Sequence, residues 1–482
     1  MTAGADGGTD PKHQGQFFIG GEFTDPRSPG RLTVTEAASG ATLAEVADAE
    51  GEDVDQAVSA ARRALPGWAA TPPVQRADHL AMLAEGIKGR TEELARTISQ
   101  EVGTPIRQSR AVQLGNPIAI TAHIAEILRD YPFEEEIGNC LVVREPVGVV
   151  AAITPWNYPL QQVMAKVAAA LAAGATVVLK ASEVAPLTAL MLGEIAQAQG
   201  LPPGVMNVLV GRGAVAGEAL VTHHGVDQVS FTGSTKAGRR ISELAAATVK
   251  PVTLELGGKS ASLVLEDADI ATAAKFAVYN AFLNSGQTCT ALTRLLVPER
   301  MAAAAVEVAV ATARKLVLGD PLDESTRLGP LASQAQLDRV RSYIARGVAE
   351  GARLVLGGAE PPDGLEQGYF VQPTIFDQVL PEMVIAQEEI FGPVLSIITY
   401  SDEDQAVEIA NGTPYGLAAA VWSADRARAI NFARRLRAGT VEVNGGAFST
   451  SAPFGGLKQS GHGREFGRFG MEEFLMPKSL QL

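Results

Sequence analysis

The stretch VGVVAAITPWNYPLQQVMAKVAAALAAGATVVLKASE (residues 147–183) contains two short runs of branched apolar residues with an alanine-rich segment between them. The runs VGVVAAIT and ATVVLK are apolar almost throughout, which is typical of parallel strands that helices cover on both faces. The segment between them is long enough for the helix that joins two parallel strands. The stretch therefore predicts a strand, a helix and a second strand of a doubly wound α/β domain.

The alternation continues on the C-terminal side. The runs GVMNVLV, VDQVSFTG and PVTLEL extend the first α/β region from Val147 to about Ile270. A second alternating region extends from about Cys289 to Asn444, with expected strands PVLSIITY, LAAAVWS and GTVEVN. In this region helices are expected over 402–410 and 425–437.

Length and composition limit the class of protein. The chain has 482 residues, of which 46% are hydrophobic and 20% charged, so it is globular and long enough for two or three domains. A net charge of -14 argues against nucleic acid or an anionic membrane as the main partner, because both would be repelled.

Nothing in the sequence indicates export or a membrane anchor. The N-terminus MTAGADGGTDPKHQ has no basic start and no apolar run, so it is expected to be a flexible tail. The longest apolar stretch, 163–179, is interrupted by Lys166 and Gly174 and is dominated by alanine. The two cysteines, Cys140 and Cys289, could form at most one disulfide, and the expected location is the cytoplasm.

Three expected strand ends carry unusual residues, and ligands of open α/β sheets bind at the carboxyl ends of strands. PWNYP follows the first run, with two prolines around Trp156, Asn157 and Tyr158. KASE places Lys180 and Glu183 after the second run, and TGSTKAG follows VDQVSF as a glycine turn before a helix. The N-terminal amides of such a helix can hold a phosphate.

The glycine motifs do not match a known phosphate loop individually. GSTKAGRR ends in Gly-Arg-Arg, and GGKS lacks the upstream glycine because Thr253 stands there. GRGAVAG (residues 211–217) has one residue too many for the dinucleotide fingerprint. Each alone is explained by turn chemistry; together they favour a nucleotide site.

Cys289 stands in a polar setting, between Thr288 and Thr290 in NSGQTCTALTRLLV, which favours an exposed loop over a packed core. An exposed thiol with an ordinary pKa is a few per cent thiolate at neutral pH and already nucleophilic. Cys140 in NCLVV is expected to be a buried structural thiol instead.

Two further residues could assist a thiol. Glu255 interrupts the apolar run PVTLELGG, so its carboxyl is either paired structurally or has a raised pKa and acts as a base. The side-chain amide of Asn157 could donate to a developing oxyanion.

The motifs PWNYP, KASE, FTGS, LELGGKS, GQTC, EEIFGPV and PFGGLKQSGHGREFG, in this order, resemble the signatures of the NAD(P)-dependent aldehyde dehydrogenase superfamily, of the non-acylating, hydrolytic type. The resemblance extends from FFIGGEF to the C-terminus. It implies an α/β, aldehyde dehydrogenase-like fold with two doubly wound α/β domains and a small β-arm for oligomerisation. The implied parts are an NAD-binding domain (1–122 and 146–256), a catalytic domain (257–458), and an oligomerisation arm with a C-terminal tail (123–145 and 459–482).

The resemblance also implies a mechanism. Cys289 would attack the aldehyde carbon, with Asn157 and the Cys289 amide holding the oxyanion, and hydride would pass to the nicotinamide. Glu255 would activate the water that hydrolyses the resulting thioester. Lys166 and Glu465 resemble a pair that relays protons towards the general base, although a simple salt bridge explains them equally well.

The matching positions for the cofactor favour NAD, with NADP possible, because Glu183 would accept hydrogen bonds from the ribose hydroxyls and repel a 2′-phosphate. The implied cofactor contacts are Thr154, Pro155, Trp156, Lys180, Ser182, Glu183, Gly213, Gly217, Phe231, Thr232, Gly233, Ser234, Leu256, Gly257, Glu389 and Phe391.

The implied substrate pocket departs from the family's common pattern at Ala165, where many members carry a bulky aromatic residue. Together with Gln161 and Gln162, this predicts a roomier and more polar tunnel. Ser285 and Ala181 are further departures, which are expected to be tolerated. The expected pocket residues are Tyr158, Gln162, Ala165, Thr288, Thr290, Phe448 and Phe454, and for the aromatic residues ordinary core packing is the alternative.

Two other functions stay open at this point. A CoA-acylating relative would pass the acyl group to a thiol, but the acylating members lack a carboxylate at the position of Glu255. A non-catalytic relative that kept the fold would have no reason to retain Cys289, Glu255 and Asn157.

The expected partners are a small aldehyde and further copies of the chain. The copies would form a homodimer or homotetramer, in which residues 133–145 and the C-terminal strand pair between subunits. No metal site is expected, because the six histidines are scattered and His223 and His224 are expected at a helix end.

Overall fold

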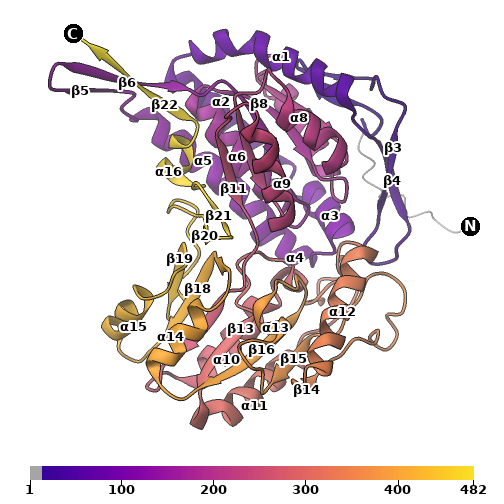
Figure 1. Ribbon diagram of the computed structural model, residues 1–482. Coiled ribbons are helices and arrows are strands. Elements are labelled where there is room, and N and C mark those ends of the chain that lie inside the picture. The colour runs from indigo at the N-terminus through magenta and orange to yellow at the C-terminus, as the bar shows by residue number, and fades with distance from the viewer. Residues whose placement is uncertain (1–12) are drawn as a thin grey trace, which may run out of the picture.

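The computed structural model describes residues 13–482, which form two large sheets, a projecting arm and their covering helices (Figure 1). The flexible tail expected at residues 1–14 lies outside the described residues except for His13 and Gln14. Within residues 13–482, every helix is too short or too polar to cross a membrane.

The first large sheet has eight strands in the order β2-β1-β9-β8-β7-β10-β11-β21. The central strands β9, β8, β7, β10 and β11 are parallel, and β1, β2 and β21 pair antiparallel at the two edges. All five apolar runs predicted as strands of this region are confirmed. The strands are β1 (Phe17–Ile19), β2 (Glu22–Thr24), β7 (Val149–Ile153), β8 (Thr176–Ala181), β9 (Met206–Val210), β10 (Gln228–Thr232), β11 (Val252–Glu255) and β21 (Gly461–His462).

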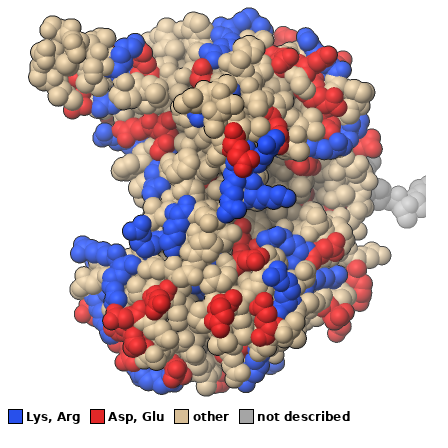
Figure 2. All heavy atoms as spheres, viewed as in Figure 1, with Lys and Arg blue, Asp and Glu red and all other residues tan. Residues whose placement is uncertain are grey.

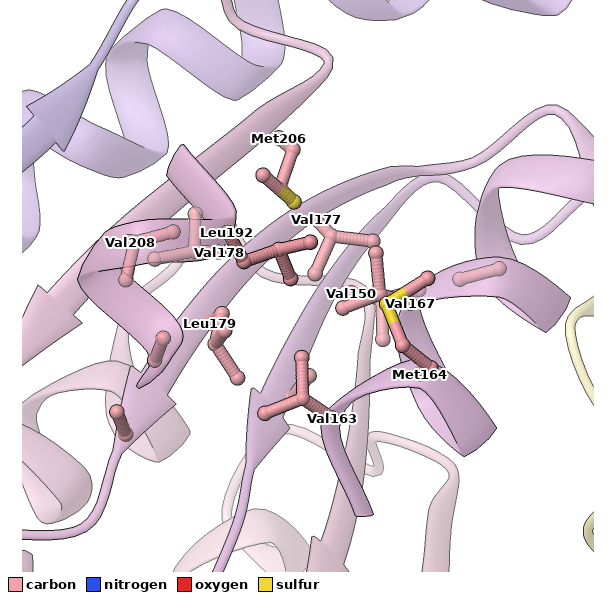
Figure 3. Close-up of a cluster of buried hydrophobic side chains, with 14 of the residues drawn as sticks. Val150, Val163, Met164, Val167, Val177, Val178, Leu179, Leu192, Met206 and Val208 are labelled. Carbon is pink, nitrogen blue, oxygen red and sulfur yellow. The ribbon is translucent and has the colours of Figure 1, made fainter. Parts of the chain in front are cut away.

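Every residue of β7, β8, β9 and β10 is buried, which requires cover on both faces because successive side chains point to opposite sides of a sheet. Figure 3 shows this core, in which Val150 lies beside Met164 and Val167 of α6, and Val208 lies near Leu192 of α7. The covering helices are α1 (Gly51–Ala69), α2 (Pro73–Gly89), α3 (Thr91–Val102), α4 (Ile106–Gln108), η1 (Ser109–Leu114), α5 (Gly115–Arg129), α6 (Pro159–Ala173), α7 (Leu187–Ala198), η2 (Gly213–Gly217), α8 (Glu218–Thr222) and α9 (Thr235–Ala246).

The second large sheet has seven strands in the order β14-β15-β16-β13-β12-β18-β19, and only β14 pairs antiparallel. The three strands predicted here are confirmed. The strands are β12 (Ala261–Val264), β13 (Arg294–Pro298), β14 (Arg353–Leu356), β15 (Thr374–Asp377), β16 (Val394–Tyr400), β18 (Ala418–Trp422) and β19 (Thr440–Val443).

Both helices expected around the second sheet are present. Asp402 and Asp425 cap their N-termini through the side chain, and the second helix ends at Ala433 rather than Arg437. The helices of this part are α10 (Ile270–Ala281), η3 (Leu283–Gly286), η4 (Glu299–Met301), α11 (Ala302–Ala313), α12 (Gln334–Ala349), α13 (Val384–Gln387), α14 (Glu403–Asn411) and α15 (Arg426–Ala433).

The arm is a three-stranded antiparallel sheet of β5 (Glu134–Ile137), β6 (Cys140–Pro146) and β22 (Leu475–Gln481), with β6 in the middle. It projects from the first sheet's side of the molecule (Figure 1). The expectation that Cys140 is buried is wrong: this thiol lies half-exposed at the start of β6, because the thin arm has no core to cover it.

Three short elements complete the fold: the hairpin of β3 (Arg31–Thr35) and β4 (Thr42–Ala47), the pair of β17 (Tyr415–Gly416) and β20 (Leu457–Lys458), and α16 (Gly467–Glu472). The segment expected as a C-terminal tail contributes to two sheets, since β21 pairs with β11 and β22 pairs with β6. Figure 2 shows a hollow between the upper and lower parts of the molecule, with Lys and Arg side chains on both of its sides.

Candidate active site

A cavity opens at the carboxyl ends of β7, β10 and β11, opposite loops of the second sheet, where the topology of a parallel sheet predicts a ligand site. The centre of a water-sized molecule can occupy about 270 Å³ of it. The residues that line the cavity are Pro155, Trp156, Asn157, Gln162, Thr232, Gly233, Ser234, Glu255, Leu256, Gly257, Cys289, Gln336, Arg339, Glu389 and Phe391.

Cys289 is held by a tightly constrained loop after η3. Asn284 and Ser285 both adopt left-handed backbone angles, with φ of 52° and 56°. Such angles cost energy in residues with a side chain, and polar contacts hold them in place: Thr104 donates to the Asn284 side chain (2.6 Å), and Ser285 donates to the carbonyl of Gly329 (2.8 Å). The substitution of Ser285 into the motif is therefore accommodated by a hydrogen bond.

Gly286 completes this turn, and no other residue fits there. A Cβ atom at Gly286 would lie 2.1 Å from backbone atoms of Gly392, and its φ is 74°. The loop that carries the thiol therefore packs directly against the backbone of the loop that carries Glu389 and Phe391.

The Cys289 thiol is half-buried and packs against the apolar cluster that contains Phe454 and Phe466. Burial raises the pKa of the thiol, and the nearby carboxyls of Glu389 and Glu255 raise it further. The expected exposed loop with an ordinary pKa is therefore wrong, because neighbours from distant segments cover the thiol. Cys289 needs a proton acceptor before it can act as a thiolate nucleophile.

Asn157 positions the loop of Cys289. Its side-chain amide donates to the carbonyl of Gln287 (2.9 Å), and its own carbonyl accepts hydrogen bonds from Gln113 and Asn284. An amide nitrogen has two N–H groups, so one is left for a ligand beside Cys289.

Glu255 is the last residue of β11 and is 4% exposed. Within residues 13–482, neither of its carboxylate oxygens has a hydrogen-bond partner. Burial raises the pKa of Glu255 well above its usual value, Glu465 raises it further, and Lys166 and Arg464 lower it. A carboxyl in this state is suited to take a proton from water.

Lys166 and Glu465 form a buried ion pair behind Glu255. The Lys166 ammonium lies 2.5 Å from Glu465 Oε1, and the two side chains are 1% and 8% exposed. A small cavity separate from the main one is lined by Ala165, Lys166, Glu255, Arg464 and Glu465, among others, and connects the pair spatially to Glu255.

Glu389 packs on the turn after β11. A Cβ atom at Gly257 would lie 2.2 Å from the Glu389 carboxylate, and the amide of Gly258 donates to Glu389 Oε1 (3.0 Å). Burial raises the pKa of Glu389 to about 7. Next to it, the rings of Trp156 and Phe391 meet edge to face at 5.5 Å.

The N-terminus of α9 faces the same cavity. Ser234 caps this twelve-residue helix by accepting from the amide of Ala237, and Gly233 and Thr232 precede it. The Thr232 hydroxyl is buried and has no partner among the described residues. These groups can bind an anionic group, since helix N-termini expose free amides and a partial positive charge.

The other expected cofactor residues are not among those that line this cavity; Phe231 lies in β10, and the rest lie around β8 and η2. Lys180 is buried and donates to the carbonyl of Gly211 (2.9 Å), with the half-exposed Glu183 at 3.4 Å. Burial lowers the pKa of Lys180. The remaining ones are Thr154, Ser182, Gly213, Gly217 and Phe231, of which Gly213 and Gly217 begin and end η2.

The expected substrate residues do not all lie in one place. Gln162 lines the main cavity. The hydroxyls of Tyr158 and Thr288 lie 2.9 Å apart, and the half-buried Thr290 follows Cys289 in the chain. Ala165 is buried in a cluster with Phe454 and Phe466, so the space beside this small residue is partly filled by aromatic rings. Phe448 is 44% exposed and lines a separate cavity with Phe454.

Sequence reasoning missed three side chains. Gln336 and Arg339 of α12 line the cavity, and Arg339 donates to the carbonyl of Glu389 (2.6 Å). Phe466 forms an aromatic group with Phe448 and Phe454, with centroid distances of 5.9 and 5.3 Å. No local pattern marks α12, whereas Phe466 belongs to the quoted motif GREFG and could have been found there.

The described part of the chain contains no group of three or more His, Cys, Asp or Glu side chains arranged to hold a metal ion. His223 caps the C-terminus of α8, as expected, and its ring stacks on His224.

Known proteins resemble the chain over nearly its whole length. The model of the aldehyde dehydrogenase family matches residues 23–480. The 3-succinoylsemialdehyde-pyridine dehydrogenase of a Pseudomonas species is 48% identical, over 96% of this chain and 98% of that protein. Among curated relatives, a putative aldehyde dehydrogenase of Staphylococcus aureus is 43% identical over 96% of this chain and 98% of that protein.

Solved structures agree with this similarity. Aldehyde dehydrogenase C of Pseudomonas syringae, in complex with NAD⁺ and octanal, has a TM-score of 0.97 at 46% identity, covering 98% of this chain and 97% of that chain. An aldehyde dehydrogenase of Mycobacterium tuberculosis in complex with NAD⁺ has a TM-score of 0.95 at 41% identity, covering 97% and 98%. The fold expected from the resemblance is confirmed, and the chain belongs to the aldehyde dehydrogenase family.

Proposed function

We propose that the protein oxidises an aldehyde to a carboxylic acid with NAD, through a covalent intermediate on Cys289. The observation that carries this proposal is that a thiol and a buried carboxyl, Cys289 and Glu255, line one cavity, and that the Glu255 oxygens have no partner within residues 13–482. A purely structural carboxylate would be paired, because an unpaired buried one is costly. The pair therefore supports covalent catalysis followed by hydrolysis.

The cavity and its surroundings fit a nicotinamide dinucleotide. The N-terminus of α9 and the Thr232 hydroxyl can bind a diphosphate, and the carboxylates of Glu183 and Glu389 can accept hydrogen bonds from ribose hydroxyls. Gly257 leaves room at the Glu389 end, where a side chain would collide with the carboxylate. When bound, NAD supplies a hydride acceptor.

The chain's own residues account for the other steps. The Cys289 thiol gives its proton to the Glu255 carboxylate, which releases it to solvent before the hydrolytic step, and the sulfur attacks the carbonyl carbon of the aldehyde. Asn157 and the amide of Cys289 donate to the oxygen that becomes negative. Departure of the hydride leaves a thioester on Cys289. Glu255 then takes a proton from water, whose oxygen attacks the thioester, and the carboxylic acid leaves as the Cys289 sulfur is released.

The cofactor preference proposed is NAD over NADP. Glu183 is 39% exposed at its side chain and lies 3.4 Å from the Lys180 ammonium at the end of β8. Its negative charge would repel a 2′-phosphate on the ribose, while Lys180 stays partly neutralised by this pairing. Complexes of related enzymes with NAD⁺ support the same preference.

The substrate class proposed is an aldehyde with an apolar chain or ring. Phe454 and Phe466 belong to the apolar cluster against which Cys289 packs, and Phe448 extends this group to the surface. Aromatic faces favour such groups through burial. The octanal and pyridine semialdehyde named for the relatives both fit this class.

The test is an assay of reduced nicotinamide absorbance with purified protein, NAD or NADP, and a panel of aldehydes that includes octanal and a pyridine-bearing semialdehyde. Each reaction is run with and without CoA. Turnover without CoA and a free carboxylic acid as product support the proposal. Turnover that requires CoA would show an acylating enzyme, and NAD binding without turnover would favour a non-catalytic relative.

The division into an NAD-binding part, a catalytic part and an oligomerisation arm belongs to this proposal, as does a cytoplasmic homodimer or homotetramer. The chain passes from the first sheet to the second between Glu255 and Ala261, and the arm leaves strand edges free for pairing. Both cysteines are free thiols, which suits a reducing compartment.

A further inference from the structure

Another cavity, with a cationic lining, lies at the C-terminal end of α14. The residues that line it are Lys259, Ser260, Ala261, Arg294, Ala410, Asn411, Thr413, Tyr415, Gly416, Leu417, Ala418, Ala419, Leu436, Arg437 and Ala438. Among the described residues, no Asp or Glu side chain lines this cavity. Basic side chains are therefore gathered around a hollow whose lining has no acidic side chain to pair with them.

Arg294 is nearly fully buried, at 2% exposed, and only part of its hydrogen-bonding capacity is used. It donates to the carbonyls of Lys259 (2.9 Å), Ile409 (2.7 Å) and Ala410 (2.7 Å). The carbonyls of 409 and 410 belong to the C-terminus of α14, whose dipole favours a cation. A guanidinium has five N–H donors, so two remain after these three bonds.

The side chains of Lys259 and Ser260 also face this region with their polar atoms unpaired among the described residues. Both residues are buried, at 2% and 3% exposed, and within residues 13–482 neither the Lys259 ammonium nor the Ser260 hydroxyl makes a hydrogen bond. Burial and the nearby Arg294 lower the pKa of Lys259 to about 7, whereas Glu389 and Glu388 raise it. A buried ammonium and a buried hydroxyl without acceptors destabilise the folded protein, because both lose their hydrogen bonds to water.

The size of the cavity limits the ligand. The centre of a water-sized molecule can move through about 20 Å³ of it, which is room for a single small species. A phosphate or a carboxylic acid would need more space, whereas a monoatomic anion does not.

We propose that this cavity binds one halide-sized inorganic anion between the ammonium of Lys259, the hydroxyl of Ser260 and the free N–H groups of Arg294. The anion accepts the hydrogen bonds that the protein leaves unmade and compensates two buried cations. It would also fix the segment that precedes β12. That segment reaches the active site, because the amide of Gly258 holds the Glu389 carboxylate.

The direct test is a bromide soak of crystals of the full chain, with anomalous scattering used to locate the ion. A bromide peak between Lys259 and Arg294 is expected. Water density without an anomalous peak at saturating bromide would overturn the proposal, since the cavity would then hold only solvent.

A solution test uses variants. The Tm of the wild type is measured in sodium bromide and in sodium gluconate at equal ionic strength, because gluconate is too large for the cavity. The Tm is expected to rise with bromide concentration, and Lys259→Met should lose this rise without unfolding, since methionine replaces an unpaired buried cation by an apolar side chain of similar length.

Lys458→Met is the matched control. Lys458 lies near the same end of α14, but its ammonium already donates to the carbonyls of Asn411 and Thr413 and does not line the cavity. This variant should keep the bromide-dependent rise in Tm. An equal rise in wild type and Lys259→Met would show a general salt effect and contradict the site.

Discussion

The side-chain amide of Asn157 lies 2.9 Å from the carbonyl oxygen of Gln287, two residues before Cys289. One bond thus ties the end of β7 in the first sheet to the loop that carries the thiol. Because both residues are buried and Asn157 is held by Gln113 and Asn284 as well, the second N–H of its amide has a fixed direction. This arrangement makes Asn157 the first residue to test.

Replacing Asn157 by Ala should lower kcat by about 100-fold or more, the cost of removing one oxyanion donor. NAD affinity should stay close to that of the wild type, which titration of protein fluorescence can measure. Asn116→Ala is a suitable control, because Asn116 bonds only Gln161 among the described residues. Unchanged turnover in Asn157→Ala would remove this residue from the mechanism.

Cys289→Ala should abolish aldehyde oxidation and leave NAD binding intact, because in the proposed mechanism this thiol forms the bond to the substrate. Cys140→Ala provides the control, since this second thiol lies on the arm at β6. Mass spectrometry after brief incubation with aldehyde and NAD should find an acyl adduct on the wild type and on Cys140→Ala only. An adduct on the Cys289→Ala protein would disprove the assignment.

Glu255 should make the rate depend on pH. Its pKa is raised, chiefly by burial, so below that pKa the carboxyl is protonated and cannot take a proton from water. The rate of thioester hydrolysis should therefore rise with pH until the pH exceeds this raised pKa. Glu255→Gln should lose this dependence and accumulate the acyl-enzyme, and a normal steady-state rate in this variant would exclude Glu255 as the base.

The same residue predicts an effect on stability. A carboxyl with a raised folded-state pKa binds its proton more tightly in the folded protein, so its contribution to stability falls as pH rises above the ordinary carboxyl pKa of about 4.3. Glu255→Gln has no such loss. The Tm of the variant should exceed that of the wild type by a margin that grows between acidic and neutral pH, whereas a constant difference would show that Glu255 does not titrate in this range.

Glu183→Gln should shift the cofactor preference towards NADP. Loss of one negative charge near the ribose should raise the NADP to NAD ratio of kcat/KM by about tenfold, or roughly 1.4 kcal/mol. Glu194→Gln on α7 serves as a control, because Glu194 pairs with Arg90 away from the cavity. An equal shift in both variants would mean that the effect is one of net charge.

The predicted strands came from continuous apolar runs, which is why β7 to β11 and β16, β18 and β19 could be located from the sequence. Short or polar strands such as β5 and β21 have no such run, and their pairing depends on partners far along the chain. The site residues also differ in whether the sequence alone could identify them. Cys289, Glu255 and Asn157 stand in recognisable motifs, whereas Gln336 and Arg339 reach the cavity only because α12 packs beside the Glu389 loop.

The surroundings of the site residues were harder to predict from the sequence than their positions in the fold. The raised pKa of Cys289 arises from burial and from Glu389, which is separated from it by 100 residues in the sequence. The partly filled space beside Ala165 arises from Phe466, which no local pattern relates to α6. Both effects depend on which distant segments meet, and only the fold supplies that information.

The pairing of β21 with β11 has a consequence for biosynthesis. The strand that ends in Glu255 receives its outer neighbour from residues 461–462, and the ion pair behind Glu255 needs Glu465. A nascent chain on the ribosome can form the central strands of the first sheet early, but it lacks the parts that enclose Glu255 until the last segment has emerged. Premature termination between Cys289 and residue 461 would therefore yield a chain that has this thiol but lacks the segment that encloses Glu255.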